Sequence, residues 1–332
     1  MKIDFVITWV DGNDPQWRKE KNQYTVKKEA DGDECRYRDM ELLKYWFRAV
    51  EAYAPWVNKI HFVTYGHLPQ WLNCDAPKLN IVNHTDFIPE KYLPTFSSHP
   101  IELNMHRIKD LSEAFVYFND DFFLNAPVSQ EFFFKKGLPC DYIYAKNIFF
   151  EDIDDVYAHV CASCIAETNK HFSYAESFFK NPFKYINFRY GLKNNIKNIL
   201  KLENTVSFTG IDDSHLPAAY LKNTFEEAWE ASPEALDRVS SNKFRTTVDV
   251  SQSVFRYRQL ASGKFSPVSK KSRGKYFRVS NDNSELIKTL NDKSCNMICI
   301  NDVPGDIDFE KAKKEIAEAF EKLLNKKSEF EL

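Results

Sequence analysis

Glycine is scarce in this chain: only 9 of its 332 residues are glycine, and no two of them lie close together. P-loops and dinucleotide-binding loops need several glycines at short spacing, because only glycine lets the backbone approach a phosphate closely. Both kinds of loop are therefore excluded. If the protein binds phosphates, metal ions and side chains must hold them.

Long apolar runs and a positive net charge are also missing. No segment approaches the roughly 20 apolar residues of a membrane-spanning helix. The N-terminal sequence MKIDFVITWVDG has Asp4 inside its short apolar stretch, which is atypical of a signal peptide. We therefore expect a cytoplasmic protein. The formal net charge of −3 argues against nucleic acid as a partner.

The seven cysteines are odd in number, and with no export signal expected, free thiols are the default. Cys161 with Cys164 and Cys295 with Cys299 could together bind zinc. Their spacing fits no standard zinc motif, so a zinc site is the less favoured alternative.

Apolar segments alternate between strand and helix patterns along the chain. Strands are predicted at residues 3–10, 59–65, 79–83, 115–118 and 296–300. Helices are predicted around residues 43–50, at 98–110, from 214 onward and at 308–324. This alternation predicts an α/β, Rossmann-like fold with a largely parallel sheet flanked by helices. In such a sheet, ligands bind beyond the carboxyl ends of the strands.

The alternation breaks at residues 141–204, which are rich in aromatic residues and, toward their end, in basic ones. We interpret this segment as a helical and aromatic insertion subdomain. It would separate a first part of the α/β catalytic core, residues 1–140, from a second part with a C-terminal helix, residues 205–332.

Two adjacent aspartates, Asp120 and Asp121, follow the strand predicted at residues 115–118. Neighbouring carboxylates beside a buried strand repel each other unless a cation lies between them. Mg²⁺ prefers such oxygen ligands and commonly bridges them to substrate phosphates, with Mn²⁺ as an alternative. Taken alone, the pair fits a polar turn or a helix cap equally well.

Five stretches occur in an order that is typical of one family. They are ITWVDGNDPQW at 7–17, the segments 37–72 and 93–128, the segment 215–258 that begins HLPAAYL, and NMICINDVPGDID at 296–308. In these stretches, and in its final SEFEL, the chain resembles the Stealth family. These are bacterial capsular polysaccharide phosphotransferases related to the catalytic subunit of the animal lysosomal-enzyme N-acetylglucosamine-1-phosphotransferase. Most of the chain, except residues 141–204, is covered by the resemblance.

The resemblance implies a Mg²⁺-dependent enzyme of surface polysaccharide synthesis. Such an enzyme transfers a sugar 1-phosphate from a UDP-sugar, such as a UDP-N-acetylhexosamine, to a hydroxyl of a glycan or lipid-linked oligosaccharide, and releases UMP. Catalytic roles are implied for His215, Arg245, Asp302 and one of the pair Asp120 and Asp121. Animal relatives have a second histidine where this chain has Ala218, so that histidine is not essential here.

The residue types suit this chemistry. A hydroxyl that attacks phosphorus must lose its proton, and His215 is an effective base for that step. His215 precedes Pro217 at what we predict to be a helix start, whose positive end would keep the ring neutral. Arg245 would stabilise charge on the transferring phosphoryl group. Without the resemblance, both residues would more often be ordinary surface residues.

Asp302 follows the strand predicted at residues 296–300, as Asp120 follows its strand. We expect Asp120, Asp121 and Asp302 to bind the metal ion together.

We expect the donor to bind to two further segments. They are the turn that follows the strand predicted at residues 3–10 and the helix predicted at 98–110. The residues are Asp11, Gly12, Asp14, His99, Glu102, Asn104 and Arg107. His99, Glu102 and His106 share one face of the predicted helix. A metal site is an alternative for this row, although a hydrogen-bonded row facing a cleft is favoured.

The segment 177–202 has no acidic residue and six basic ones. Its apolar residues repeat at helical spacing, which predicts a basic amphipathic helix. Such a helix either packs on the core with a solvated lysine edge or docks on an anionic surface. That surface would be the inner face of the plasma membrane or the growing phosphodiester polymer.

Two other functions are compatible with the sequence. A nucleotide-sugar glycosyltransferase would use the same strand-end aspartates but would release UDP. An inactive glycan-binding protein is the second alternative, and the presence of His215, Arg245 and Asp302 speaks against it.

Overall fold

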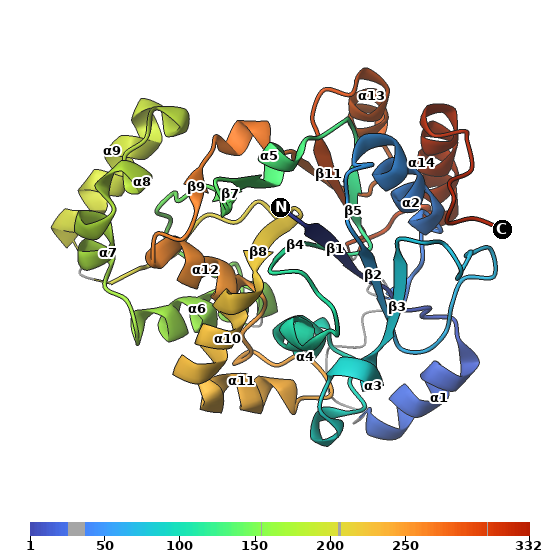
Figure 1. Ribbon diagram of the computed structural model, residues 1–332, viewed down its shortest axis with the longest axis horizontal. Helices are drawn as coiled ribbons and strands as arrows, with labels where there is room; N and C mark the ends of the chain where they lie inside the picture. Colours follow the sequence, from blue (N-terminus) through green and yellow to red (C-terminus); the bar gives the residue numbers. More distant parts are fainter. Residues whose placement is uncertain (26–36, 154, 205–206, 304) are drawn as a thin grey trace.

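The computed structural model describes residues 1–25, 37–153, 155–204, 207–303 and 305–332. At its centre lies a five-stranded sheet in the order β3-β2-β1-β4-β8 (Figure 1). The strands are β1 (Ile3–Thr8), β2 (Ile60–Thr64), β3 (Leu79–Asn83), β4 (Ala114–Phe118) and β8 (Ala218–Leu221). The first four are parallel, and β8 runs antiparallel to β4. The predicted α/β fold with a largely parallel sheet is confirmed.

Helices cover both faces of this sheet (Figure 1). Ile3, Phe5 and Ile7 of β1 pack into one apolar cluster, whereas Val6 points into another. The first cluster includes α2 (Leu43–Tyr53), α13 (Ser284–Asp292) and α14 (Phe309–Leu323). The second includes α4 (Ser98–Asn104), α10 (Lys222–Ala231), α11 (Pro233–Ser240) and α12 (Ser253–Ala261). Because both faces are covered, the central strands read as continuous apolar runs in the sequence.

A second sheet brings the C-terminal part of the chain to the end of β4. It contains β10 (Lys275–Arg278), β11 (Met297–Asn301) and β5 (Phe122–Leu124). The strand predicted at 296–300 is β11, but it pairs with β5 and β10 rather than with the main sheet. A third small sheet is made of β6 (Phe134–Lys135), β7 (Leu138–Asp141) and β9 (Ser266–Pro267). The remaining short helices of the core are α1 (Pro15–Tyr24), α3 (His84–Phe87) and α5 (Gln130–Phe133).

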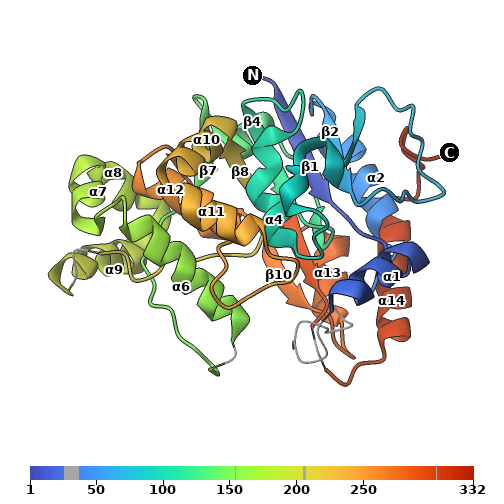
Figure 2. The same ribbon diagram turned by 90° about the horizontal axis from the view of Figure 1, so that it is seen from below.

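Four helices gather at one side of the molecule, at the left of Figures 1 and 2. They are α6 (Val156–Asn169), α7 (Tyr174–Lys180), α8 (Pro182–Tyr185) and α9 (Gly191–Asn204). Their buried Tyr174, Phe178 and Tyr185 belong to the same apolar cluster as Phe115 of β4 and Phe255 of α12. This part of the chain is helical and aromatic as predicted, and the division at residues 140 and 204 stays a prediction. Among the described helices, none is long and apolar enough to cross a membrane.

Two helix predictions are wrong in their bounds. The chain does not enter a helix at Ser214: it forms β8 first, and α10 begins at Lys222. His215 has a φ of 46°, a left-handed backbone conformation that a helix does not accept. The helix predicted at 98–110 ends at Asn104 and is followed by a single 3₁₀ turn, Met105–Arg107.

The C-terminal tail packs across α2. The Arg48 guanidinium donates to both carboxylate oxygens of Glu331, over 2.8 and 2.7 Å, and both side chains are almost fully buried. Phe330 packs against Phe47 with ring centroids 5.2 Å apart. The tail is therefore part of the core around α2.

Candidate active site

The carboxyl ends of β1 and β4 lie side by side in the middle of the main sheet, with Ile7 opposite Phe118. In the sheet, β2 and β3 lie on one side of β1, whereas β4, the next strand along the chain, lies on the other side of β1. Ligands of open α/β sheets bind in the crevice at such a point of reversal. Asp11 follows β1 here, and Asp120 and Asp121 follow β4.

Negative charge is concentrated at this point. Loss of hydration among the surrounding protein atoms, together with the carboxylates of Asp121 and Asp39, raises the pKa of Asp120 to about 7. Asp120 keeps solvent-accessible surface, so a ligand can reach it. The Oδ1 atom of Asp121 is buried and has no hydrogen-bond partner among the described residues. Carboxylates on adjacent residues and a buried oxygen without a partner fit a hard divalent cation such as Mg²⁺.

His215 reaches this cluster from the loop before β8. Its Nε2 atom lies 3.7 Å from Oδ2 of Asp121, and its ring packs edge-on against Phe122. Burial lowers the pKa of His215, but the nearby carboxylates of Asp121 and Asp213 more than offset this, so the pKa lies above its ordinary value of 6.5. The prediction that a helix start keeps the ring neutral is therefore wrong. A raised pKa makes the ring a stronger base.

Cys299 of β11 completes this cluster, and the sequence indicated it only as part of the less favoured zinc site. Its Sγ atom lies 3.2 Å from Oδ2 of Asp121. Burial and the neighbouring carboxylates raise the pKa of the Cys299 thiol well above its usual range, so the thiol donates a hydrogen bond to Asp121. Among the described residues, Asp121, His215 and Cys299 form the one group of three with ligand atoms all within 4.8 Å of one another.

The alternative of a four-cysteine zinc site is wrong. Cys164 lies on α6, where its sulfur contacts Ser251, and the Cys295 thiol donates to the Met297 carbonyl. The described cysteines do not assemble into a group of metal ligands. Cys35 lies outside the described residues.

Asp302 is held by an arginine that sequence reasoning missed. Arg38 donates from Nε and Nη2 to the two carboxylate oxygens of Asp302, both over 2.8 Å. The described residues that gather as metal ligands do not include Asp302. The structure therefore does not assemble the predicted set of Asp120, Asp121 and Asp302: of the three, only Asp121 belongs to the group of possible metal ligands, and both Asp302 oxygens accept from Arg38.

A buried network supports the loop that carries His215. Asp213 accepts hydrogen bonds from the His215 backbone N–H over 3.0 Å and from the Ser253 hydroxyl over 3.2 Å. Arg256 binds both oxygens of Asp141, over 2.8 and 2.9 Å, and donates to the Asp212 carbonyl over 3.0 Å. Burial raises the pKa of Asp213, but the Arg256 charge and these hydrogen bonds bring it below its ordinary value. The network fixes the position of the His215 backbone.

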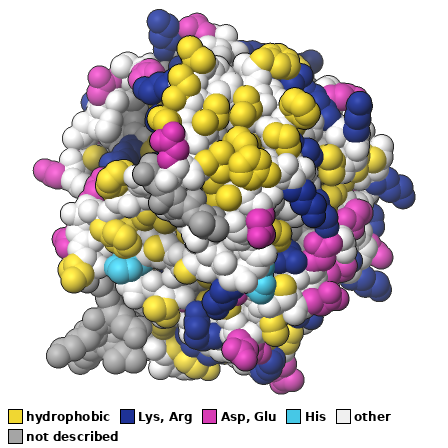
Figure 3. All heavy atoms as spheres, turned by 90° about the vertical axis from the view of Figure 1, so that its left-hand side faces the viewer, with side chains coloured by type: hydrophobic (Ala, Val, Ile, Leu, Met, Phe, Trp, Pro, Cys, Tyr) yellow, Lys and Arg dark blue, Asp and Glu magenta, His cyan; other side chains and the backbone are white. Residues whose placement is uncertain are grey.

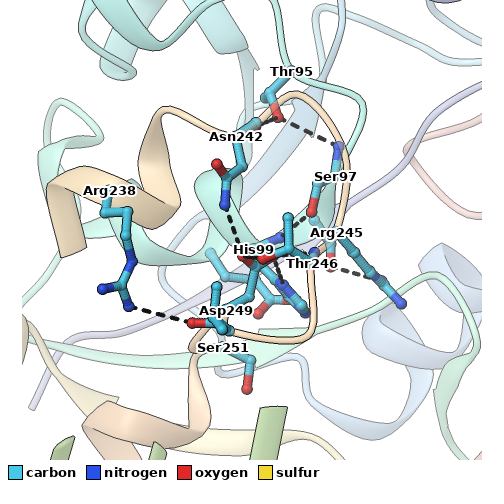
Figure 4. A network of polar contacts seen from close by, with 12 residues as sticks. Thr95, Ser97, His99, Arg238, Asn242, Arg245, Thr246, Asp249 and Ser251 are labelled. Atoms are coloured by element: carbon cyan, nitrogen blue, oxygen red, sulfur yellow. Dashed lines mark hydrogen bonds and ion pairs between the residues drawn. The ribbon is translucent and has the colours of Figure 1, made fainter. Parts of the chain in front are cut away.

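A second network holds the loop that carries Arg245 against α4 (Figure 4). The His99 Nδ1 atom lies 2.9 Å from Oδ2 of Asp249, which also accepts the backbone N–H of Thr246. Arg245 donates from Nη2 to the Ser98 hydroxyl over 2.9 Å. Arg245 thus lies at the N-terminal end of α4, and His99 positions its loop.

Glu102 is buried and linked to the end of β4. It accepts the backbone N–H of Gln252 over 3.1 Å, and it lies 3.5 Å from the Tyr117 hydroxyl. The same hydroxyl lies 2.5 Å from Oδ1 of Asn119, the residue before Asp120. Glu102 therefore helps to set the position of the catalytic candidates.

The other residues predicted on this helix point elsewhere. Asn104 is fully buried, and its amide donates to the Pro100 carbonyl and the Ser240 hydroxyl, so its predicted role in donor binding is corrected to packing α4 on α11. Arg107 donates to the Asn104 side chain and lies over the Trp229 ring.

His106 does not face a cleft with His99 and Glu102. Its ring is buried against Phe225 and Trp229, and burial lowers its pKa to about 3. The 3₁₀ turn that follows Asn104 tightens the chain and changes the face on which His106 lies.

The turn after β1 is built tightly. The Asp11 N–H donates to Nε2 of His67 over 2.7 Å, and Asp14 caps α1 by accepting the Trp17 N–H. A methyl group at Gly12 would lie 2.1 Å from the carbonyl oxygen of Tyr37, so only glycine fits there. Donor binding by these three residues stays a prediction.

The chain matches known proteins over its whole length. Residues 36–140 match conserved region 2 of Stealth proteins, and residues 1–28 match conserved region 1. It is 42% identical to a capsular polysaccharide phosphotransferase (WcwK) of Streptococcus pneumoniae, over 99% of this chain and 98% of that protein. It is 39% identical to a receptor polysaccharide phosphotransferase (WefC) of Streptococcus gordonii, over 100% and 99%. With an exopolysaccharide phosphotransferase of Lactiplantibacillus plantarum the identity is 37%, over 99% and 96%.

Solved structures match at much lower identity. The apo-form glycosyltransferase GlyE of Streptococcus pneumoniae matches with a TM-score of 0.40 and 8% identity, over 98% of this chain and 62% of that chain. The galactosyltransferase LgtC, in complex with donor and acceptor sugar analogs, matches with a TM-score of 0.40 and 11% identity, over 97% and 95%.

Proposed function

The chain belongs to the Stealth family, and from this premise we propose that it transfers a sugar 1-phosphate from a UDP-sugar to a glycan hydroxyl in surface polysaccharide synthesis. A UDP-N-acetylhexosamine is the proposed donor, and a glycan or lipid-linked oligosaccharide is the proposed acceptor. The proposed place of the reaction is the cytoplasm.

The bonds made and broken follow from this assignment. The acceptor hydroxyl oxygen forms a bond to the phosphorus that carries the sugar. The bond from that phosphorus to the oxygen bridging the two phosphates breaks, and UMP leaves with this oxygen. The hydroxyl proton passes to a base, and the product is a phosphodiester.

The observation that carries the proposal is the approach of His215 Nε2 to within 3.7 Å of Asp121, beside Asp120, at the point where open α/β sheets generally bind ligands. The His215 imidazole accepts the proton of the acceptor hydroxyl. Asp121 and the Asp213 network orient the ring for this step. Arg245 supplies a planar cation for the phosphoryl oxygens.

Asp120 and Asp121 would hold Mg²⁺ or Mn²⁺, as their unpaired oxygen and mutual repulsion indicate. Bound there, the cation would neutralise charge on the diphosphate of the donor. Asp302 acts through Arg38 rather than as a metal ligand, because its carboxylate fixes the guanidinium in one orientation.

The test is to identify the nucleotide that the enzyme releases. The protein is incubated with a panel of UDP-sugars, an acceptor glycan and Mg²⁺, and the products are separated by chromatography. UMP with a new phosphodiester in the glycan is the expected result. Release of UDP would instead show glycosyl transfer, and glycan binding without turnover of any donor would show a binding protein.

A further inference from the structure

A groove of about 900 Å³ lies between α9 and the segments 144–149 and 269–271. It belongs to the side of the molecule that Figure 3 shows, where hydrophobic side chains gather among basic and acidic ones. Sequence reasoning indicated the basic residues of α9 but not the other side of this groove.

The groove is strongly basic. Of the described residues that line it, six carry a positive charge and one, Asp212, a negative charge. The basic residues are Lys146, Arg189, Lys197, Lys201, Lys270 and Lys271. Lys270 pairs with Asp212 over 2.6 Å, and burial lowers the pKa of Lys201. The remaining positive charge favours a ligand with several negative charges.

Aromatic rings lie among these cations. Tyr144 and Tyr190 pack edge to face in the wall of the groove, with ring centroids 5.2 Å apart. Phe188, also in the wall, is 81% exposed. Aromatic rings offer rigid apolar faces to a ligand such as a sugar ring. Phosphates bind to cations. A chain that contains both groups therefore matches the groove.

One short segment of the chain connects the groove to the candidate active site. Asp212 lines the groove, and its backbone N–H donates to the Tyr144 carbonyl over 2.9 Å. The next residue, Asp213, holds the backbone of His215. A chain bound in the groove thus lies beside the segment that carries the proposed base.

We propose that this groove binds the acceptor as a polyanionic glycan, a chain that already contains phosphodiesters. The proposal rests on the proposed function, in which each transfer adds one phosphodiester and so one negative charge to the product. The groove favours the product of earlier rounds over a neutral glycan. Lys201 and Lys270 are half-buried in the lining of the groove, so a single chain that enters it contacts more of their surface than a flat bilayer.

The test compares two triple variants with the same change in charge. Lys146→Glu, Lys197→Glu and Lys271→Glu together reverse three exposed cations of the groove. Lys180→Glu, Lys193→Glu and Lys326→Glu together reverse three exposed cations outside it. Binding is measured by titration calorimetry with an oligosaccharide that contains several hexose-phosphodiester links and with a neutral oligosaccharide of the same number of sugars, joined by glycosidic bonds alone. Vesicles of phosphatidylglycerol are the third ligand.

The groove variant should bind the polyanionic oligosaccharide about tenfold more weakly or worse, and added salt should weaken wild-type binding. The control variant should bind like the wild type, and the neutral oligosaccharide should bind weakly to all three proteins. Thermal unfolding should stay unchanged in the groove variant, which shows that it folds.

Equal binding of the polyanion by both variants, or equal binding of the neutral oligosaccharide by the wild type, would overturn the proposal. A groove variant that loses only vesicle binding would assign the surface to a membrane and would also overturn it. Binding is measured without a donor, so it does not depend on turnover. Release of UDP in place of UMP would refute the proposed function alone.

Discussion

The Nε2 atom of His215 lies 3.7 Å from Oδ2 of Asp121 because β8 runs antiparallel to β4. In an antiparallel pair, the start of one strand lies beside the end of the other. Ala218 at the start of β8 is therefore opposite Tyr117 near the end of β4. The residues just before β8 and just after β4 meet, and these are His215 and the two aspartates.

Replacement of either strand-end aspartate should weaken metal binding and greatly reduce turnover. Asp120→Asn and Asp121→Asn each remove a negative charge from the proposed cation site, and we expect turnover to fall by about 100-fold or more. Titration calorimetry should show that Mg²⁺ binding weakens in both variants. Full activity of the wild type in EDTA would leave the pair as a structural turn.

His215→Ala should remove chemistry and leave donor binding nearly intact. A proton acceptor is needed only in the transition state, so we expect kcat to fall by about 100-fold while the dissociation constant of the UDP-sugar changes little. Single-turnover kinetics and calorimetry separate the two quantities. A large rise in the dissociation constant with unchanged chemistry would make His215 a binding group.

Arg245→Lys should lose most of the activity although it keeps the positive charge. The ammonium group cannot present two parallel donors to phosphoryl oxygens, so we expect a loss of about 100-fold in kcat. Ser98→Ala is the matched control, since it removes the hydroxyl that accepts from Arg245 and should cost much less. Wild-type turnover by the lysine variant would exclude Arg245 from the phosphoryl site.

Arg38 and Asp302 should behave as one unit. Arg38→Gln and Asp302→Asn each break the same bidentate pair, and we expect each to lower kcat by about tenfold or more. The double variant should be no worse than the more damaged single variant, because the interaction is already lost. If Asp302→Asn alone weakened Mg²⁺ binding in calorimetry, Asp302 would be a metal ligand after all.

Glu331→Gln should destabilise the fold without changing the chemistry. Glu331 is almost fully buried against Arg48, so its loss should cost about 2 kcal/mol and lower Tm by roughly 3 °C. Glu321→Gln is the control: Glu321 also binds Arg48, but its side chain is 50% exposed, and its loss should change Tm little. Equal effects of both substitutions would contradict this account.

The effect of Glu331 should depend on pH in one direction. Burial raises the pKa of Glu331, but hydrogen bonds from Arg48 and the Ser328 backbone more than offset this, so the folded-state pKa lies below its ordinary value of 4.5. A lowered carboxyl pKa stabilises the folded state fully above pH 4.5, and the contribution is lost as pH falls through the lowered value. The difference in Tm between wild type and Glu331→Gln should shrink over that range.

The central strands could be predicted from the sequence because both faces of the sheet are covered. Residues 79–83 were predicted as a strand with the bounds of β3, and 115–118 lie within β4. The strand β8 was missed because AAYL is short and has no alternating pattern, and Pro217 before it looked like a helix start. Only its pairing with β4 makes it a strand, and a single sequence does not show that pairing.

The same limit explains which site residues were missed. The sequence places Asp120 and Asp121 after a strand, which indicates a ligand site by itself. Arg38 belongs to the site because it binds Asp302, and Cys299 belongs to it because its thiol donates to Asp121. In each pair, the two residues are far apart in the chain. No local pattern distinguishes such residues from ordinary core or surface residues.

The backbone N–H of Ile300 donates to the carbonyl of Asp121, and β5 follows this aspartate directly. The metal-binding candidate is thus tied to the second sheet as well as to the first. Partial unfolding that releases only β11 would break this hydrogen bond to Asp121 and inactivate the enzyme, while the main sheet stays folded. Loss of activity in mild denaturant would then report the opening of this small sheet, ahead of the global transition.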